Sequence, residues 1–316
     1  MLSFSAMAGV EIARAIVRNA RIDSSWEGTD YPVGPCRAHR RRGADRNIDE
    51  GSTMRWGVLV LLAAVGLLGC TTPAPRPASK PTSAFIEETA IDVPERSGDA
   101  VLVNASRAGI VAAGIDAVYR SDRLTGASID LFVYPAGRMQ PEEGLLQGQR
   151  EFRESLDEAQ NQNLFHDLQV DEPEPFPFAG ADGVPRSAYK NRLRFSKPQG
   201  LLESRAWLTY KQNYWFKLRM TATPELASDL DAIGDEIARD VFSRAEALSK
   251  GNCASITLTL PPQPTFEQLT EAAMAGMKQR RAAGCVEKDY PELPPGYRRT
   301  VLLFEPDSWS ESSPAR

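Results

Sequence analysis

The sequence predicts an α+β fold in which a mostly antiparallel sheet has long helices packed on it, followed by a C-terminal strand-helix-strand extension. Three observations predict this fold class. Residues 189–195 alternate basic side chains with mostly apolar ones, two strand patterns meet at Lys211-Gln212-Asn213, and two long segments carry helical stripes of apolar residues. Such strands and helices each have one apolar face, so they are expected to pack against one another.

The composition is that of an ordinary globular protein. The chain has 316 residues, of which 42% are hydrophobic and 8% aromatic, and its net charge is −5. A disordered, collagen-like or polytopic membrane protein would show a compositional bias that is absent here. The acidic balance also argues against a nucleic-acid partner, because binding to phosphates needs a basic surface.

Residues 54–69 have the features of a secretory signal peptide. Arg55 precedes 14 uncharged, mostly apolar residues, 56–69, and the segment ends in a small side chain. As a helix the segment would extend about 21 Å, at roughly 1.5 Å per residue, which is short of a hydrocarbon core of ~30 Å. It is therefore a poor candidate for a membrane span.

The end of this segment, Leu67-Leu68-Gly69-Cys70, resembles the lipobox of bacterial lipoproteins. The resemblance implies that the Cys70 thiol receives a diacylglyceryl group and that cleavage follows Gly69. Because Thr71 rather than Asp follows the cysteine, it also implies a location in the bacterial cell envelope, lipid-anchored to the outer membrane and facing the periplasm. Two or three acyl chains hold a protein on a bilayer without a spanning helix. The alternative is a buried helix that ends at an ordinary cysteine.

Two segments flank the signal peptide. Residues 1–53 carry eight arginines against seven acids and lack paired apolar runs, so we expect a start assigned too early in the gene or a disordered leader. A long basic leader is the alternative. Residues 70–83 combine the lipid anchor with a tether that contains four prolines. Proline-rich segments favour extended polyproline II, which gives this tether a reach of roughly 40 Å.

Residues 84–250 are expected to form the α+β domain. In its first half, strand patterns at 101–103, 115–119 and 128–134 precede a helix that begins at Pro141 and buries Leu145, Phe152, Leu156 and Ala159. Prolines at 173, 175 and 177 predict a loop or an edge segment, because proline cannot donate to a central ladder.

The second half of this domain contains the strand at 189–195, a hairpin of residues 201–210 and 214–220, and a helix capped by Thr223. On the second strand of the hairpin, Phe216, Leu218 and Met220 are expected in the core, with Lys217 and Arg219 on the other face. The helix is expected to begin at Pro224, and its predicted buried stripe comprises Leu226, Leu230, Ile233, Ile237, Val241 and Leu248.

The C-terminal extension, residues 251–306, is predicted to contain a strand at 256–260, a helix and a last strand at 297–304. The capping box Thr265-Phe266-Glu267-Gln268 opens the helix and Gly284 ends it. Along this helix, Phe266, Leu269, Ala273 and Met277 are expected to face inward. The polar tail, residues 307–316, is expected to be loose.

The order of these elements is similar to that of the DcrB-like and PsbP-like α/β sandwich. The residues that carry the resemblance are Asp130-Leu131-Phe132-Val133-Tyr134-Pro135 before the first helix, the Gly180-Ala181-Asp182-Gly183 turn, and Tyr214-Trp215-Phe216 before the second helix. The resemblance implies a fold and no active site.

Cysteine usage predicts one disulfide bond. Cys36 lies in the leader and Cys70 takes the lipid, which leaves Cys253 and Cys285 in an oxidising compartment if the protein is exported. A bond between them would close a loop of about 33 residues. The alternative is two separate buried thiols.

No catalytic, metal or cofactor site is predicted. The two histidines are His39 in the leader and His166, which is expected near the end of the long helix, where an imidazolium complements the helix dipole. Ser187-Ala188-Tyr189-Lys190 matches Ser-x-x-Lys, but its alternation predicts a strand instead of the helix that this acylating pair needs. The acids between Asp167 and Glu174 lack the spacing of an EF-hand, so a solvated loop is expected.

One surface is a candidate binding site. Five basic residues are expected on the solvent-facing sides of the predicted strands: Lys190, Arg192, Arg194, Lys217 and Arg219. If the strands are neighbours, these side chains form a basic patch that suits an anionic envelope polymer, lipid headgroups or an acidic envelope protein. The alternative is a solubilising face on which each charge pairs with nearby acids.

The sequence thus predicts a lipid-anchored bacterial envelope protein that acts as a binding or scaffold module. Its expected partners are the membrane, through the N-terminal lipid, and an envelope protein or anionic envelope polymer. A carboxylate-dependent hydrolase acting on envelope material is the alternative, and it would need two close acids in a pocket. A third hypothesis is a purely structural role in an assembly.

Overall fold

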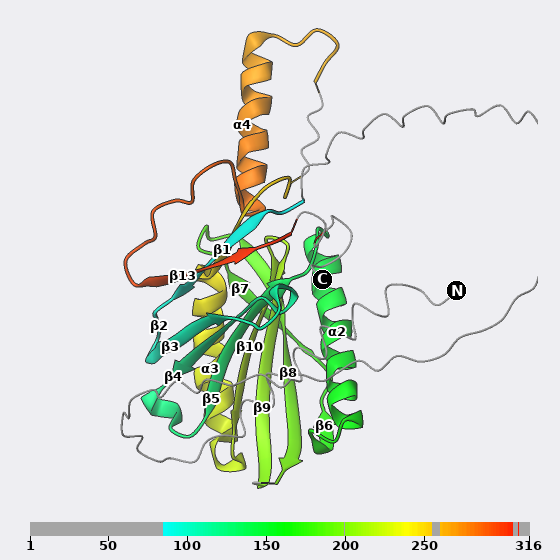
Figure 1. The fold of residues 1–316 in the computed structure, drawn as a ribbon, viewed down its shortest axis with the longest axis vertical. Coiled ribbons are helices and arrows are strands. Elements are labelled where there is room, and N and C mark those ends of the chain that lie inside the picture. The colour runs from blue at the N-terminus through cyan, green and yellow to red at the C-terminus, as the bar shows by residue number, and fades with distance from the viewer. Residues whose placement is uncertain (1–84, 199, 255–259, 306–308, 310–316) are drawn as a thin grey trace, which may run out of the picture. The chain divides into compact units, whose positions relative to one another are not determined.

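The computed structural model describes residues 85–198, 200–254 and 260–305 together with Trp309. Within these residues the larger sheet has nine strands, and each pairing in it is antiparallel (Figure 1). The predicted α+β class with a mostly antiparallel sheet is confirmed. The strand order is β2 (Arg96–Ser97), β3 (Ala100–Arg107), β4 (Ile115–Arg120), β5 (Ser128–Pro135), β10 (Tyr214–Ala222), β9 (Gly200–Lys211), β8 (Pro185–Lys197) and β6 (His166–Val170), with β7 (Glu174–Ala179) also pairing with β8.

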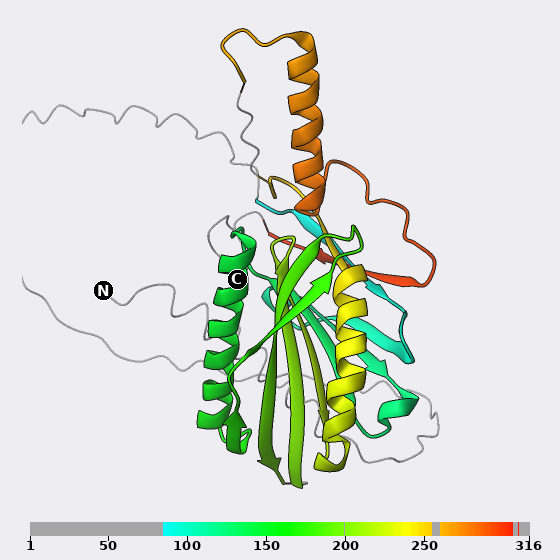
Figure 2. The same cartoon turned by 180° about the vertical axis from the view of Figure 1, so that it is seen from behind.

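A helix covers each face of this sheet, as Figures 1 and 2 show from opposite sides. On one face α2 (Pro141–Asn161) buries Phe152 in a cluster that includes Trp215 of β10. On the other face α3 (Ala227–Arg244) buries Ile237 in a cluster that includes Trp207 of β9. Side chains two positions apart on a strand share a face, so Lys217 lies on the same side of β10 as Trp215. The helix α2 covers this side.

Two glycines let the helices approach the sheet closely. A Cβ atom at Gly148 of α2 would lie 2.6 Å from Nε1 of Trp215, and one at Gly234 of α3 would lie 2.3 Å from Cη2 of Trp207. Real Cβ atoms are not found at such distances from a packed ring, so only glycine permits this spacing of helix and tryptophan.

The predicted hairpin is confirmed, with a two-residue turn between β9 and β10. Gln212 and Asn213 both have positive φ angles, 56° and 66°. Two successive left-handed residues make the tight type of turn whose twist matches that of antiparallel strands. The register then places Trp215 opposite Tyr210 and Leu218 opposite Trp207.

A second, four-stranded sheet joins the two ends of the described chain. Its order is β12 (Cys285–Val286), β11 (Glu246–Lys250), β1 (Glu88–Pro94) and β13 (Tyr297–Leu303). The predicted last strand is confirmed as β13, whereas β1 has no counterpart in the sequence-based prediction. This sheet contains strands from both predicted segments, 84–250 and 251–306. Because β1 pairs with β13 and β11 pairs with β12, the sheet spans the predicted boundary. Most of the strand predicted at 256–260 lies outside the described residues.

The ends of two predicted helices need correction. A short 3-10 turn, η3 (Pro224–Leu226), precedes α3, and the Thr223 side chain does not cap it. Leu248 belongs to β11 and not to the helix, because α3 ends at Arg244 and Ala245 already has an extended conformation. The long helix α2 ends at Asn161, so His166 lies in β6, where it is exposed.

Trp309 corrects the expectation of a uniformly loose tail. Its side chain is buried, and its ring lies 5.5 Å from that of Phe85, 5.2 Å from that of Tyr214 and 5.0 Å from that of Phe304. The aromatic contacts therefore join the tail to β10 and to the end of the second sheet where β1 begins and β13 ends. Among the described helices, none is long and apolar enough to cross a membrane.

Candidate functional site

Three of the predicted basic residues lie on the α3 face of β8, where acids neutralise them. Nζ of Lys190 lies 2.6 Å from Oδ1 of Asp231 and 2.9 Å from Oδ1 of Asp235, and both aspartates belong to α3. Nε1 of Trp207 also donates to Oδ1 of Asp235, at 3.0 Å. Lys190 is only 5% exposed, so it contributes to helix-sheet packing and not to a free basic surface.

Arg205 of β9, which the sequence analysis did not single out, is central to this charged network. Its Nε lies 3.2 Å from both carboxylate oxygens of Asp231, and its Nη1 lies 3.1 Å from Oε2 of Glu203. Although burial by itself raises it, the pKa of Asp231 is lowered overall by the hydrogen bond from Lys190 and the charge of Arg205. No signal in the sequence near Arg205 indicates its role, because its partner Asp231 belongs to α3, a separate element.

In the outer part of the network, acids pair with the other two predicted basic residues of β8, Arg192 and Arg194. Arg192 contacts Asp231, with Nε 3.3 Å from Oδ1, and also contacts Glu174 of β7. Nε of Arg194 donates to Oε1 of Glu203 at 2.6 Å. Each of the three predicted basic residues of β8 therefore has at least one acidic partner.

Lys217 and Arg219 lie on the opposite, α2 face of the sheet. Nζ of Lys217 is 4.9 Å from the centre of the Phe132 ring and 5.6 Å from the centres of the Tyr134 and Phe152 rings. Lys217 is 5% exposed, and burial lowers its pKa to about 7. Arg219 lies 4.0 Å from Asp130. The structure therefore does not bring the five predicted basic residues together on one surface.

The expectation of a single basic patch is wrong because both faces of the sheet are covered. The alternation along β8 and β10 is as predicted, but strand alternation alone does not say whether a second helix covers the polar face. The register pairs Lys190 with Trp207 and Trp207 with Leu218, so the basic side chains of β8 share a face with Leu218 and lie on the opposite face from Lys217.

The Ser-x-x-Lys stretch lies on β8, in agreement with the prediction of a strand. Ser187 and Lys190 are separated by three positions, so their side chains point to opposite faces of the sheet. This geometry excludes an acylating pair.

No group of three or more histidine, cysteine or acidic side chains in the described part of the chain is arranged to hold a metal ion.

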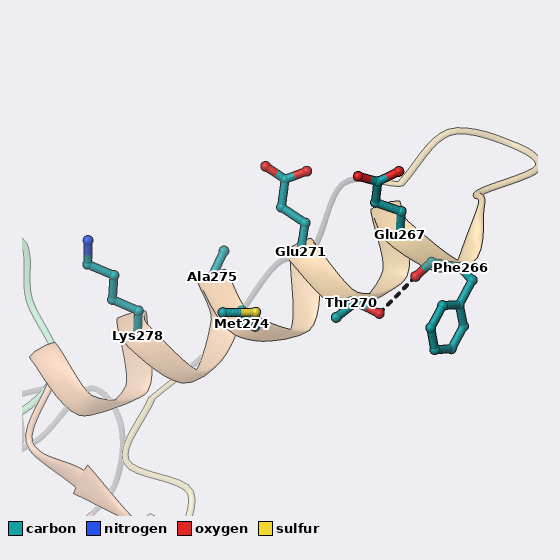
Figure 3. Close-up of a pocket in the computed structure, with 7 residues that line it drawn as sticks. All are labelled: Phe266, Glu267, Thr270, Glu271, Met274, Ala275 and Lys278. Carbon is teal, nitrogen blue, oxygen red and sulfur yellow. Dashed lines mark hydrogen bonds between the residues drawn. The ribbon is translucent and has the colours of Figure 1, made fainter.

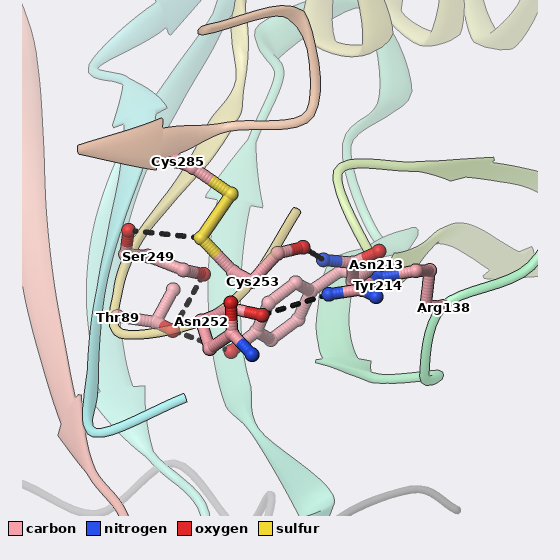
Figure 4. Close-up of a disulfide and its surroundings, with 8 residues drawn as sticks. All are labelled: Thr89, Arg138, Asn213, Tyr214, Ser249, Asn252, Cys253 and Cys285. Atoms are coloured by element: carbon pink, nitrogen blue, oxygen red, sulfur yellow. Dashed lines mark hydrogen bonds between the residues drawn. A yellow bond between two sulfur atoms is a disulfide. The ribbon is translucent and has the colours of Figure 1, made fainter. Parts of the chain in front are cut away.

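Cys253 and Cys285 lie at disulfide distance, with their sulfur atoms 2.09 Å apart (Figure 4). Both side chains are buried. Nδ2 of Asn213, in the turn between β9 and β10, donates to the backbone oxygen of Cys253 at 3.1 Å. The hydroxyl of Tyr214 donates to Oγ1 of Thr89 at 2.7 Å. The cysteine pair thus lies where the second sheet meets the hairpin of the larger one.

Between the two cysteines in the sequence lies a highly exposed helix, α4 (Phe266–Ala282). The predicted capping box is confirmed: the Thr265 side chain accepts from the backbone of Gln268, and the Gln268 side chain accepts from the backbone of Thr265. Gly276 is the one buried residue of this helix. The side chain of Phe266 is 85% exposed, that of Met274 62% and that of Met277 58%.

The expectation that the apolar stripe of α4 faces inward is therefore wrong. The helical spacing is present, but Phe266, Leu269 and Met277 are all exposed. Figure 3 shows the open hollow along this helix, and the side chains that line it all belong to α4: Phe266, Glu267, Thr270, Glu271, Met274, Ala275 and Lys278. Charge is divided along the helix, because Glu267 and Glu271 lie in its first half and Lys278, Arg280 and Arg281 in its last turns.

No family model and no curated protein matches this sequence. Among solved structures, the chain is similar to the cyanobacterial PsbP protein CyanoP from Synechocystis sp. PCC 6803, with 11% sequence identity and a TM-score of 0.33; the match covers 45% of this chain and 81% of that one. It is also similar to a protein of unknown function from Pseudomonas aeruginosa, with 13% identity and a TM-score of 0.28, over 53% of this chain and 100% of that one. A PsbP-like protein is thus a weak structural neighbour of this chain.

Proposed function

We propose that this protein is a lipid-anchored binding or scaffold module of the bacterial cell envelope, and that α4 is the element that binds its partner. The observation that carries this proposal is the exposure of α4, a helix of 17 residues in which one glycine is buried and four large apolar side chains are exposed. Contiguous apolar surface of this kind marks interaction sites in soluble domains.

Holding α4 in a fixed position is consistent with this role. α4 has 17 residues, and a helix only slightly longer than about 12–15 residues is not very stable in water by itself. Here the capping box supports the first turn, and Cys285, three residues beyond the last turn, is joined to Cys253. A partner that packs on α4 would therefore find the helix already formed, which lowers the entropic cost of binding.

The charged network argues against the basic strands as the main binding surface. Lys190, Arg192 and Arg194 contact Asp231, Glu174 and Glu203, so a polyanion would have to displace these acids. The acids gathered beside β8 do not favour the alternative of a carboxylate-dependent hydrolase, because each of them contacts a lysine or an arginine.

The proposed anchor is Cys70, which lies outside the described residues. We expect Cys70→Ser to move the protein from the detergent phase to the aqueous phase in a temperature-induced detergent partition of cells of the native host. Loss of two or three acyl chains removes stable membrane binding. Cys36→Ser, in the predicted leader, is the matched control and should leave the partition unchanged. Partition of wild-type protein into the aqueous phase, with no mass increase at Cys70, would contradict the anchor.

The binding role of α4 can be tested by placing a photo-crosslinking amino acid at Met274 in the native host. Val184, which is 52% exposed in the turn before β8, is the control position because its exposure is similar. We expect covalent adducts with a partner from position 274 and none from position 184. Equal yields at the two positions, or no adduct at either, would show that α4 is not a binding element.

A further inference from the structure

We infer that α4 lies on the surface of the lipid bilayer that holds the proposed anchor, with its apolar stripe among the lipid headgroups and the first acyl carbons. This inference rests on the proposed function and adds the identity of the partner. Three properties carry it: the exposure of the stripe, the positions of the charges around the helix, and the short distance between α4 and the start of the described chain.

The apolar stripe runs along nearly the whole helix. Phe266, Leu269, Ala273 and Met277 follow one another at spacings of three and four residues, which places them on one side, and all four are exposed. From Phe266 to Met277 the stripe extends about 16 Å along the axis, at roughly 1.5 Å per residue. A helix in the plane of a membrane interface buries such a side about 5–10 Å deep and needs no spanning length.

The charges of α4 are divided around the helix as a lipid surface requires. At about 100° per residue, Arg280 and Arg281 lie about 25° and 75° from the centre of the stripe. Glu267 and Glu271 lie about 115° and 155° from it, and Figure 3 shows both of them on the side of α4 away from Phe266. Arginines beside an apolar stripe can extend their charged ends to lipid phosphates, while the glutamates stay in water.

The last turn of α4 is close to the start of the described chain. The backbone nitrogen of Glu87 donates to the oxygen of Lys250 at 2.9 Å, and that of Ser249 donates to the oxygen of Gly284 at 2.7 Å. One strand, β11, therefore lies between Glu87 and Gly284. Because neighbouring strands are ~4.8 Å apart, the two are separated by about 10 Å. The chain that leads from the proposed anchor thus enters the domain beside the end of α4.

The length of that chain keeps α4 within reach of the bilayer. Residues 71–84 separate Cys70 from Phe85, and a chain of this length spans at most about 50 Å, at roughly 3.3–3.6 Å per residue. A surface tethered this closely has a high effective concentration, so a helix of modest affinity is enough to bind it. The tether therefore favours the bilayer over a protein that α4 would have to meet by diffusion.

Fluorescence quenching of the lipidated protein in vesicles of phosphatidylethanolamine and phosphatidylglycerol tests this inference. A fluorescent amino acid is placed at position 277 in the stripe, at position 271 on the far side of the same helix, or at position 184, and the vesicles carry brominated acyl chains, which quench on contact. We expect quenching at 277 to be at least about threefold stronger than at 271 or 184, because only Met277 lies in the bilayer. Glu271 is the matched control, since it is an exposed residue of the same helix.

Two charge reversals test which side of α4 meets the lipid. Arg281 and Lys278 are both exposed and both lie in the last turns of the helix, but only Arg281 is next to the stripe. We expect Arg281→Glu to reduce the quenching at position 277 at least about threefold, because a glutamate there is repelled by phosphatidylglycerol. Lys278→Glu should leave the quenching nearly unchanged. Each variant adds a glutamate near the same helix end, so a general loss of helix stability would affect both. Equal losses in the two variants would overturn the proposed orientation.

The outcomes separate this inference from the proposed function. Equal quenching at positions 277 and 271, in protein that stays with the vesicles, overturns the docking of α4 on the bilayer and leaves the anchor intact. If the Met274 crosslinks then join a different protein, α4 remains a binding element with that partner. Wild-type protein that does not stay with the vesicles contradicts the anchor, and both proposals fail.

Discussion

Replacing both Cys253 and Cys285 by alanine is expected to lower the free energy of unfolding by about 3–4 kcal/mol. The two residues are 32 positions apart in the sequence. A bond between them restricts the unfolded chain, and its loss returns that freedom to the unfolded state. Because both side chains are buried, the alanine variants also lose some packing around the former sulfur atoms.

The same substitution is expected to loosen the base of α4. The helix is followed by Gly284, with a φ angle of 74°, and then by β12, which pairs with β11 at two positions only. A ladder this short cannot hold a helix of 17 residues in place without the cysteine pair. Proteolysis should therefore cut the double variant faster within residues 260–284 than it cuts the wild type.

Urea unfolding of oxidised and reduced protein measures this effect. A reducing agent should lower the unfolding midpoint of the wild type to that of the double alanine variant, and should leave the variant itself unchanged. The variant is thus the control for effects of the reductant elsewhere. Equal midpoints for oxidised and reduced wild type would mean that no bond exists between these cysteines.

Local patterns predicted the core of this fold well. The strands β4, β5 and β10, the helix α2 and the turn at Gln212 and Asn213 follow from side-chain alternation, helical spacing and turn composition. Each of these signals acts over a few neighbouring residues, so a single sequence contains it. The cysteine pair was also predictable, because only Cys253 and Cys285 remained once the leader and the lipidation site had been assigned.

The features that escaped prediction depend on residues distant in sequence. β1 is short and lies between β11 and β13, which follow it by more than 150 residues, so nothing near it in the sequence indicates its pairing. The basic residues of β8 were expected at a surface because their acidic partners Asp231 and Asp235 belong to α3, a separate element. For α4 the error is the reverse, because an apolar stripe at helical spacing predicts burial, whereas this stripe is exposed.

Replacing either of two buried lysines, Lys211 or Lys217, by methionine is expected to change the free energy of unfolding, but in opposite directions. Burial lowers the pKa of both Lys211 and Lys217 to about 7, from an ordinary value of 10.5. Nζ of Lys211 donates to the backbone oxygen of Phe242 at 2.6 Å and to that of Ala245, at the C-terminal end of α3. Nζ of Lys217 instead lies among three aromatic rings, and the charges of Asp116 and Asp130 offset the effect of its burial only in part.

Lys217→Met is expected to raise the free energy of unfolding at neutral pH by about 1–3 kcal/mol, because it replaces a buried amine by an apolar side chain of similar length. Lys211→Met is expected to lower it by a similar amount, about 1–3 kcal/mol, because two carbonyls at the helix end lose their donor. A neutral amine still donates hydrogen bonds, so the loss at position 211 should persist at high pH.

The pH dependence distinguishes these effects from general changes in packing. Between pH 7 and 10.5 the unfolded chain binds a proton at each lysine that the folded chain has already released, so wild-type stability rises with pH across this window. The advantage of Lys217→Met should therefore be largest at or below pH 7 and shrink toward pH 10.5. Urea unfolding at several pH values measures it. If Lys217→Met instead destabilises the protein at every pH, the attraction between the ammonium and the Phe132, Tyr134 and Phe152 rings exceeds the cost of burying the charge.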